Sequence, residues 1–134
     1  MKIEDYIKLN EGLRLKPYRC SAGKLTIGYG RNLEDVGVSK KEAELLLEND
    51  IENCVNSLFD VFDNFISLSY NRRMVLTDMI FNLGRTRFVK FKKMIQAIKD
   101  EDFDEAALQI LDSQYAEQLP SRSERNANMM KEGV

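Results

Sequence analysis

The chain has 134 residues, of which 43% are hydrophobic and 31% charged, with 20 Lys and Arg, 22 Asp and Glu, and no histidine. This length suits one domain, and with only 2 prolines and 7 glycines the chain is neither disordered nor fibrous. The missing histidine excludes Ser-His and Cys-His nucleophile pairs and His-ligated metals. Acid–base chemistry near neutral pH therefore falls to carboxylates, thiols, lysines or tyrosines.

Targeting segments and metal motifs are not expected. The longest apolar runs, such as residues 79–81, are far shorter than a bilayer-spanning helix, and the N-terminus lacks the pattern of a secretory signal. Cys20 and Cys54 have neither a zinc-ligand spacing nor a disulfide-framework pattern. We therefore expect reduced thiols, no metal and no stable membrane insertion.

The charge is unevenly distributed along the chain. Residues 1–34 carry seven basic and four acidic side chains, residues 35–68 carry two and eight, and residues 69–134 carry eleven and ten. A net charge of -2 therefore does not exclude an anionic ligand held by the basic first section.

The first predicted element is a short amphipathic helix over residues 3–11. Ile3, Ile7 and Glu11 share one stripe at helical spacing, and Gly12 is a plausible stop. The pattern predicts that Glu11 ends the helix and points toward its buried side.

A β-hairpin is predicted next. Residues 15–20 and 25–30 flank the turn-forming residues 21–24, and the second arm alternates with a period of two. Cys20 and Thr26 should therefore lie close together on neighbouring arms. Gly28 and Gly30 leave one face of the second arm bare, which suits close approach of a ligand or another backbone.

The remainder of the chain is predicted to be helical. Ser39 and Glu42 form a capping box at the start of the longest helix, which extends to about residue 59. The further helices expected are residues 70–83, a basic amphipathic helix over 87–98, residues 102–111, and shorter pieces beyond Pro120. The predicted fold is α+β and mainly α: an N-terminal lobe with a hairpin (1–38), an interlobe helix (39–60) and an all-helical lobe (61–134).

The first lobe carries a specific motif. The sequence E-G-L-R-L-K-P-Y beginning at Glu11, then Cys20, Gly23 and T-I-G-Y-G beginning at Thr26, resembles the active-site signature of phage-type lysozymes, the T4-lysozyme-like endolysins of glycoside hydrolase family 24. In that signature Glu is followed after eight residues by Asp or Cys, and after five more by Thr. The resemblance extends to the interlobe helix, to Phe81-Asn82-Leu83-Gly84 and to the arginines at 122 and 125.

The resemblance implies site residues. Cleaving a glycosidic bond needs an acid for the leaving oxygen and a second group on the opposite side of the sugar. Glu11 is the expected acid, and its place on the apolar stripe predicts a desolvated carboxyl. Arg122 matches the family arginine near this acid, and pairing with Glu11 would oppose the effect of desolvation. The sequence leaves open which effect dominates.

Cys20 stands where family members more often have aspartate. A neutral thiol gives little help to a developing cation, so the hypothesis requires a thiolate, which neighbouring Arg19 and Lys24 could favour; it would act as nucleophile or as base. The resemblance further implies that Thr26 holds water or sugar, that Asn82 binds substrate amides, and that Tyr18 and Gly30 support the site. Arg31 replaces the usual histidine and is interpreted as an ion-pair donor.

The function implied by the resemblance is that of an endolysin muramidase. It would hydrolyse the β-1,4 bond between N-acetylmuramic acid and N-acetylglucosamine in peptidoglycan, without a cofactor and as a monomer. It would accumulate in the host cytoplasm and need a holin-type permeabilising partner. The alternative is a weakly active or inactive binding or morphogenetic module, because Cys20 replaces a carboxylate. The basic residues 85–93 could also suggest nucleic-acid binding, but basic helix faces are usually only solvated, and no nucleic-acid partner is expected.

Overall fold

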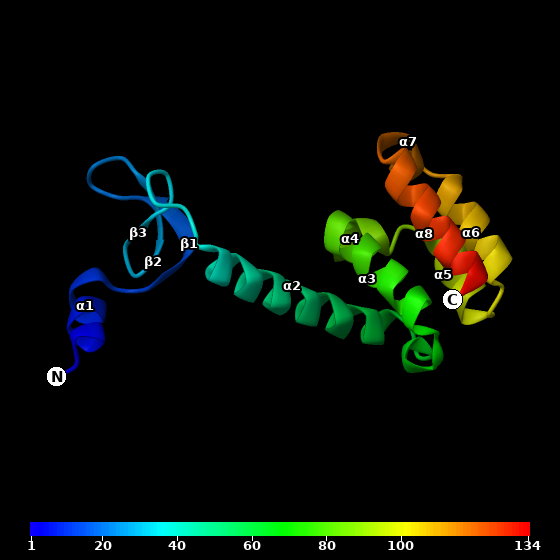
Figure 1. Ribbon diagram of the computed structural model, residues 1–134, viewed down its shortest axis with the longest axis horizontal. Coiled ribbons are helices and arrows are strands. Elements are labelled where there is room, and N and C mark those ends of the chain that lie inside the picture. The colour runs from blue at the N-terminus through cyan, green and yellow to red at the C-terminus, as the bar shows by residue number, and fades with distance from the viewer. The chain divides into compact units, whose positions relative to one another are not determined.

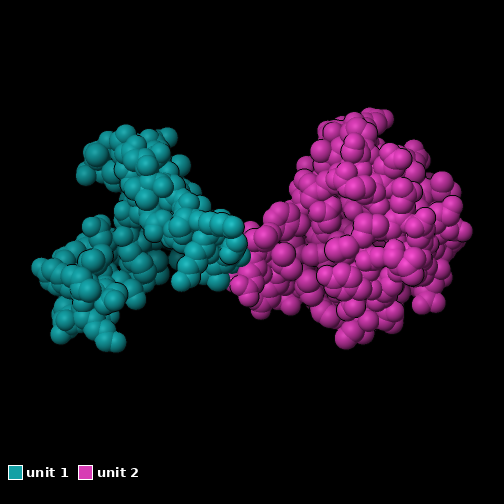
Figure 2. Space-filling view, in the orientation of Figure 1, with its two compact units in different colours: residues 1–46 teal, residues 47–134 magenta.

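The computed structural model describes residues 1–134, which form eight α-helices, one short 3-10 helix and a three-stranded antiparallel sheet (Figure 1). The α+β, mainly helical fold class is therefore confirmed. The chain divides into two compact units, residues 1–46 and residues 47–134, which Figure 2 shows in different colours. None of the helices combines the length and the apolar character required to span a bilayer.

The first unit contains helix α1 (Ile3–Glu11) and strands β1 (Arg14–Arg19), β2 (Leu25–Gly28) and β3 (Arg31–Asn32). The predicted helix and hairpin are confirmed. Strand β3 was not predicted, because two residues are too few to show an alternating pattern. The sheet order is β1-β2-β3, with both neighbouring pairs antiparallel.

Helix α1 ends as the sequence predicts, but it does not bury its apolar stripe. Gly12 has a φ of 70° and its N–H donates to the Lys8 carbonyl at 2.9 Å. Ile3 and Ile7 remain 65% and 46% exposed, and α1 has no buried residue. Within the first unit, the predicted burial of Glu11 is therefore not found. A unit of 46 residues is too short to enclose a hydrophobic core, and its one buried residue is Thr26.

Helix α2 (Lys40–Val61) is the longest, as predicted. Its capping box is confirmed in both directions: the Ser39 N–H donates to Glu42 Oε1 at 2.9 Å, and the Glu42 N–H donates to Ser39 Oγ at 3.1 Å. Two of the amides at the start of the helix are thereby satisfied.

The second unit holds the hydrophobic core. Its helices after α2 are η1 (Phe65–Ser67), α3 (Tyr70–Leu83), α4 (Arg85–Phe88), α5 (Lys92–Lys99), α6 (Phe103–Leu111), α7 (Gln114–Gln118) and α8 (Pro120–Glu132). Helix α3 packs against both α4 and α8, and α6 packs against α5 and α8. The largest fully buried side chains are Leu58, Phe62, Val75, Leu76, Met79, Phe88, Met94, Ile98, Ile110 and Met130.

The structure corrects three helix predictions in this unit. The helix predicted over 87–98 is two helices, because the chain turns at residues 89–91 with the Phe91 N–H donating to the Phe88 carbonyl. This turn buries Phe88 and lets the Phe91 ring meet Tyr115 edge-on at 6.2 Å. Helix α7 was not predicted, and the pieces expected beyond Pro120 form one 13-residue helix.

Cys54 on α2 lies at the edge of the core of the second unit. It packs against the buried cluster, and burial followed by the charge of Asp50 raises the pKa of its thiol. Met74 on α3 is 42% exposed, although its neighbours Val75 and Leu76 are buried. Both cysteines are free thiols, as expected.

Candidate active site

Glu11 is the last residue of α1, and its side chain lies against the sheet of the first unit. A Cβ built on Gly30 would come within 2.8 Å of Glu11 Oε2 and 3.0 Å of Cδ. Gly30 also has a φ of 80°, in the region that favours glycine. Gly30 is therefore the residue that leaves room for the Glu11 carboxylate. The sequence predicted a close approach at this glycine and did not identify what approaches.

Cys20 follows β1 directly and opens the hairpin turn. The Gly23 N–H donates to the Cys20 carbonyl at 2.8 Å, and the Cys20 N–H donates to the Lys24 carbonyl at 3.0 Å. Gly23 has a φ of 78°, which this tight turn requires. The thiol is half-buried at the rim of the turn.

The turn stabilises a thiolate at Cys20. The backbone amide of Lys24, the backbone amide of Ala22 and the Thr26 hydroxyl lower the pKa of the thiol, and partial burial opposes them. The sequence attributed this effect to the charges of Arg19 and Lys24, and the structure corrects the cause. Arg19 is paired with Glu34 at 2.6 Å and the Lys24 ammonium with Asp35 at 3.4 Å, so backbone dipoles act instead.

Thr26 lies on β2 opposite Tyr18 and is only 3% exposed. Its hydroxyl donates to the Lys24 carbonyl at 2.8 Å. Because the hydroxyl proton can rotate, the same group can donate to the Cys20 sulfur when the thiol is ionised, and its lone pairs stay able to accept. The predicted proximity of Cys20 and Thr26 is confirmed by the contribution of the Thr26 hydroxyl to the Cys20 pKa.

Tyr18 is half-buried on β1, and the Arg14 guanidinium lies over its ring at 4.6 Å from the centroid. A second cation–π contact joins Lys8 of α1 to the Tyr29 ring at 5.2 Å. The Lys8–Tyr29 contact connects α1 to the turn between β2 and β3, whereas the Arg14–Tyr18 contact lies within β1. Each has a modest energetic value at a site that is partly or largely exposed.

Arg31 is the ion-pair donor that the sequence predicted. Its guanidinium donates to both carboxylate oxygens of Glu42, at 2.9 and 2.8 Å, and to the Gly37 carbonyl at 3.1 Å. The Arg31 bonds are the first cause, and the Ser39 amide the second, that lower the pKa of Glu42 to about 2. Arg31 thus attaches the sheet to the start of α2, close in sequence to Gly30.

Asn82 and Arg122 lie in the second unit. Asn82 is exposed near the end of α3. Arg122 on α8 makes a bidentate pair with Asp78 on α3, at 2.9 and 2.6 Å. Asn126 joins the pair by donating to Asp78 at 3.0 Å and to the Tyr115 hydroxyl at 2.9 Å. The role of Arg122 beside the acid stays a prediction, and its observed partner is Asp78.

Two supporting groups were missed by the sequence analysis. Glu34 accepts from the Leu25 N–H at 3.0 Å as well as from Arg19, and so ties the hairpin to the chain after β3. Asp78 is 44 positions from Arg122, and no local pattern reveals such a pair. The structure contains no group of three or more acidic or cysteine side chains that could hold a metal ion.

The first unit therefore presents a carboxyl at Glu11, a thiol whose ionised form is favoured at Cys20, and a buried hydroxyl at Thr26. Acid-assisted displacement at a glycosidic carbon uses a carboxylic acid and a second, anionic group that is usually a carboxylate, and a thiolate is chemically able to serve as that second group.

Comparison with known proteins also relates this chain to enzymes that are named lysozymes or endolysins. Residues 8–127 match the family described as Phage lysozyme. The chain is 28% identical over 164 aligned residues to the probable T4-type lysozyme 2 of Dictyostelium discoideum, covering 98% of this chain and 95% of the relative. It is 38% identical over 86 residues to the endolysin of Acyrthosiphon pisum secondary endosymbiont phage 1, covering 61% and 57% respectively. It is also 26% identical over 153 residues to the pre-baseplate central spike protein Gp5 of Enterobacteria phage T4, covering 93% of this chain and 27% of that protein.

Proposed function

Because the chain belongs to the phage lysozyme family and is a lysozyme-type enzyme, we propose that it hydrolyses the β-1,4 bond between N-acetylmuramic acid and N-acetylglucosamine in peptidoglycan. The observation that carries this proposal is the grouping of Cys20 and Thr26 on one hairpin, with the thiolate favoured. Glu11 is held against Gly30 of the same unit.

Glu11 acts as the general acid. In its protonated form it donates a proton to the glycosidic oxygen, and the C–O bond breaks as positive charge develops at the anomeric carbon. The Gly30 contact limits the positions available to this carboxyl, and a restricted donor costs less entropy to align with the leaving oxygen.

Cys20 supplies the second group as its thiolate. The thiolate either attacks the anomeric carbon, giving a thioglycoside that water then hydrolyses, or takes a proton from the water that attacks. The backbone amides of Lys24 and Ala22 support both routes, because they favour the anion. The anomer of the first product distinguishes the routes, since direct attack by water inverts the carbon and a covalent intermediate retains its configuration.

Thr26 positions the water or the sugar through its free lone pairs. Tyr18 and Gly30 hold the surrounding sheet and the acid in place. Asn82, with its exposed amide, binds the N-acetyl or peptide amides of the glycan, and Arg122 supports the second unit through Asp78.

Turbidity loss of permeabilised Gram-negative cells tests the assignment of the acid. The wild type and Glu4→Gln, an exposed acid in the first turn of α1, should clear the suspension at similar rates. Glu11→Gln should be slower by about 100-fold or more, the usual contribution of a general acid. Equal rates for Glu11→Gln and Glu4→Gln would remove Glu11 from the reaction.

Alkylation of Cys20 tests whether its thiolate takes part in the reaction. Complete modification of Cys20 by iodoacetamide should stop lysis. The Cys54→Ala variant, treated with iodoacetamide in the same way, should lose lysis to the same extent, because the inhibition depends on Cys20 alone. Unchanged lysis after complete modification of Cys20 would exclude the thiolate from the mechanism.

A second candidate function is a module that grips glycan and does not cut it. Two observations favour it: Cys20 replaces the more common aspartate, and the chain resembles part of a phage spike protein. Retention of all variants on insoluble peptidoglycan, with no turbidity loss for the wild type, would establish this function in place of hydrolysis.

The partners follow from the proposed muramidase. No cofactor takes part, the protein acts as a monomer, and a holin-type partner gives it access from the host cytoplasm to the wall. Purified protein should clear permeabilised cells and spare intact ones, and should elute from a sizing column at the mass of one chain. Equal clearing of intact cells would remove the need for a permeabilising partner.

A further inference from the structure

The hairpin turn that carries Cys20 is closed by one carboxylate from outside the hairpin. Arg19 and Leu25 face each other across β1 and β2 as the last pair before the turn. Glu34 Oε1 accepts from Arg19 Nη1 at 2.6 Å and from the Leu25 N–H at 3.0 Å. A single oxygen atom therefore joins the two arms of the hairpin at the residue next to Cys20.

The contact of Glu34 with Arg19 extends into the turn itself. The Arg19 nitrogen that binds Glu34 also donates to the Gly23 carbonyl at 3.0 Å. The Gly23 N–H in turn donates to the Cys20 carbonyl at 2.8 Å. A carboxylate holds a guanidinium in a defined orientation, because charge-assisted hydrogen bonds are short and directional. Glu34 therefore restrains the shape of the turn through Arg19.

The segment that carries Glu34 is fixed by its own hydrogen bonds. The Leu33 N–H donates to the Leu25 carbonyl at 2.8 Å. The Asn32 side chain accepts from the Asp35 N–H at 3.1 Å and donates to the Asp35 carboxylate at 2.9 Å, which closes a local turn. Glu34 lies between these two anchors, so its carboxylate reaches the hairpin from a backbone that is itself held in place.

The shape of the hairpin turn matters for the chemistry of Cys20. The backbone amides of Lys24 and Ala22 lower the pKa of the thiol most, the Thr26 hydroxyl adds to them, and partial burial opposes them. No charged side chain contributes to this lowering of the pKa. Because hydrogen bonds weaken steeply with distance and angle, a small change in the turn alters the stability of the thiolate.

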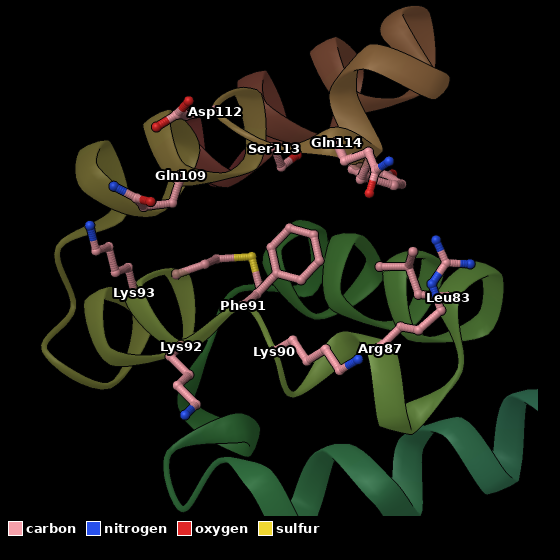
Figure 3. Close-up of a pocket in the computed structure, with 12 residues that line it drawn as sticks. Leu83, Arg87, Lys90, Phe91, Lys92, Lys93, Gln109, Asp112, Ser113 and Gln114 are labelled. Atoms are coloured by element: carbon pink, nitrogen blue, oxygen red, sulfur yellow. The ribbon is translucent and has the colours of Figure 1, made fainter.

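The basic side chains that border the cavity of the second unit do not converge in a comparable way. This cavity of about 530 Å³ is lined by Arg87, Lys90, Lys92 and Lys93, all of which are exposed. Figure 3 shows these four side chains spread apart and pointing in different directions. Their charges face solvent, whereas the Glu34 carboxylate binds a defined set of atoms beside a reactive thiol.

We propose that Glu34 is a positioning residue for Cys20: its carboxylate closes the hairpin at the pair of Arg19 and Leu25, and so holds the turn in the shape that directs its backbone amides to the sulfur. This inference rests on the role proposed for Cys20 in hydrolysis. The charge of Glu34 alone would act in the opposite direction, because a nearby carboxylate disfavours a thiolate. The positioning effect and the charge effect therefore predict opposite results when Glu34 is removed.

The rate of alkylation of Cys20 by iodoacetamide tests the proposal, measured by mass spectrometry in a Cys54→Ala background at a pH below the pKa of the thiol. There the rate follows the thiolate fraction. Glu34→Ala should slow the reaction about threefold, which corresponds to a rise of about half a unit in the pKa of Cys20. Removing a negative charge and freeing Arg19 would speed the reaction instead. Glu34→Gln keeps an oxygen acceptor at the same place and should restore most of the wild-type rate.

A second variant keeps the charge and changes only the geometry. Glu34→Asp shortens the side chain by one methylene and should also slow alkylation, although an effect of charge alone predicts the wild-type rate. Exposed ion pairs contribute little to stability, so these variants should stay folded, which circular dichroism checks. If Glu34→Ala fails to fold, the rate of Glu34→Asp decides, and a wild-type rate in Glu34→Asp would overturn the proposal.

Asp35→Asn is the matched control. It removes the same charge from the neighbouring position, where the carboxylate pairs with the Lys24 ammonium at 3.4 Å and binds no backbone group. It should react as fast as the wild type or faster. Equal slowing in Asp35→Asn, or a Glu34→Ala rate at or above that of the wild type, would contradict the positioning role. Thiol chemistry and not lysis is the readout, so failure here leaves the proposed muramidase function intact, and failure of that function leaves these rates interpretable.

Discussion

The carboxylate of Glu11 occupies the space into which a side chain at Gly30 would project, because a Cβ at position 30 would lie 2.8 Å from Glu11 Oε2. The proposed acid is thus positioned by a residue 19 positions away that has no side chain. This relationship makes Gly30 part of the positioning of Glu11, and it yields a direct test.

Gly30→Ala should displace the Glu11 carboxyl and slow lysis by about 10- to 100-fold, because small displacements of a catalytic group have effects of this size. It should also lower the free energy of unfolding by about 1–2 kcal/mol, because alanine is disfavoured at positive φ. Gly37→Ala is the matched control: its φ is 66°, and nothing lies within 4 Å of the added Cβ. It should lose similar stability and keep its rate of lysis. Equal rates in the two variants, measured per folded protein, would contradict the positioning role.

Thr26→Val should raise the pKa of Cys20, because it removes a hydroxyl that stabilises the thiolate. The pH dependence of alkylation by iodoacetamide, followed by mass spectrometry, measures this shift. In the wild type Cys20 should react faster than Cys54, whose pKa is raised by burial.

The control for this experiment is Thr77→Val, which removes a hydroxyl bond to the Arg73 carbonyl in the other unit. It should leave the Cys20 profile unchanged. A Thr26→Val profile identical to that of the wild type would show that backbone amides alone stabilise the thiolate.

The Arg31–Glu42 pair should make stability depend on pH in the acid range. The pKa of Glu42 is lowered from 4.5 to about 2 in the folded protein, so its contribution is complete above pH 4.5 and is lost as the pH falls toward 2. Arg31→Gln removes the largest cause and should flatten this part of the curve of urea-unfolding free energy against pH. Lys40→Gln, which removes a nearby exposed charge outside any ion pair, should keep the wild-type slope. A wild-type slope in Arg31→Gln would assign the pKa of Glu42 to its Ser39 contacts.

Asp78→Asn should destabilise the second unit by about 1–2 kcal/mol, since it weakens the bidentate pair with Arg122 at a partly exposed site. Asp60→Asn removes the more exposed pair with Arg85 and should change stability by less than about 0.5 kcal/mol. Urea unfolding followed by circular dichroism compares the two. If Asp78→Asn costs no more than Asp60→Asn, the network with Asn126 contributes nothing beyond a surface ion pair.

The break between α4 and α5 at residues 89–91 shows why the spacing of apolar residues could not predict the helix boundaries in the second unit. The basic residues 87–98 have helical spacing throughout, and no glycine or proline interrupts them. The break arises because Phe88 is fully buried while Phe91 turns toward Tyr115, a contact between residues 24 positions apart. Local propensity contains no information about such a partner.

The elements with local signals could be predicted from the sequence: the helix ending at Glu11, the hairpin that brings Cys20 and Thr26 together, the capping box of Ser39 and Glu42, and α3. Each depends on residues a few positions apart, where spacing and turn chemistry suffice. Three features became visible in the folded chain alone: the Glu11 carboxylate lies beside Gly30, Arg122 pairs with Asp78, and backbone amides rather than lysine or arginine charges favour the Cys20 thiolate. Those outcomes depend on which distant groups the packed chain brings together, and on how little core a unit of 46 residues can enclose.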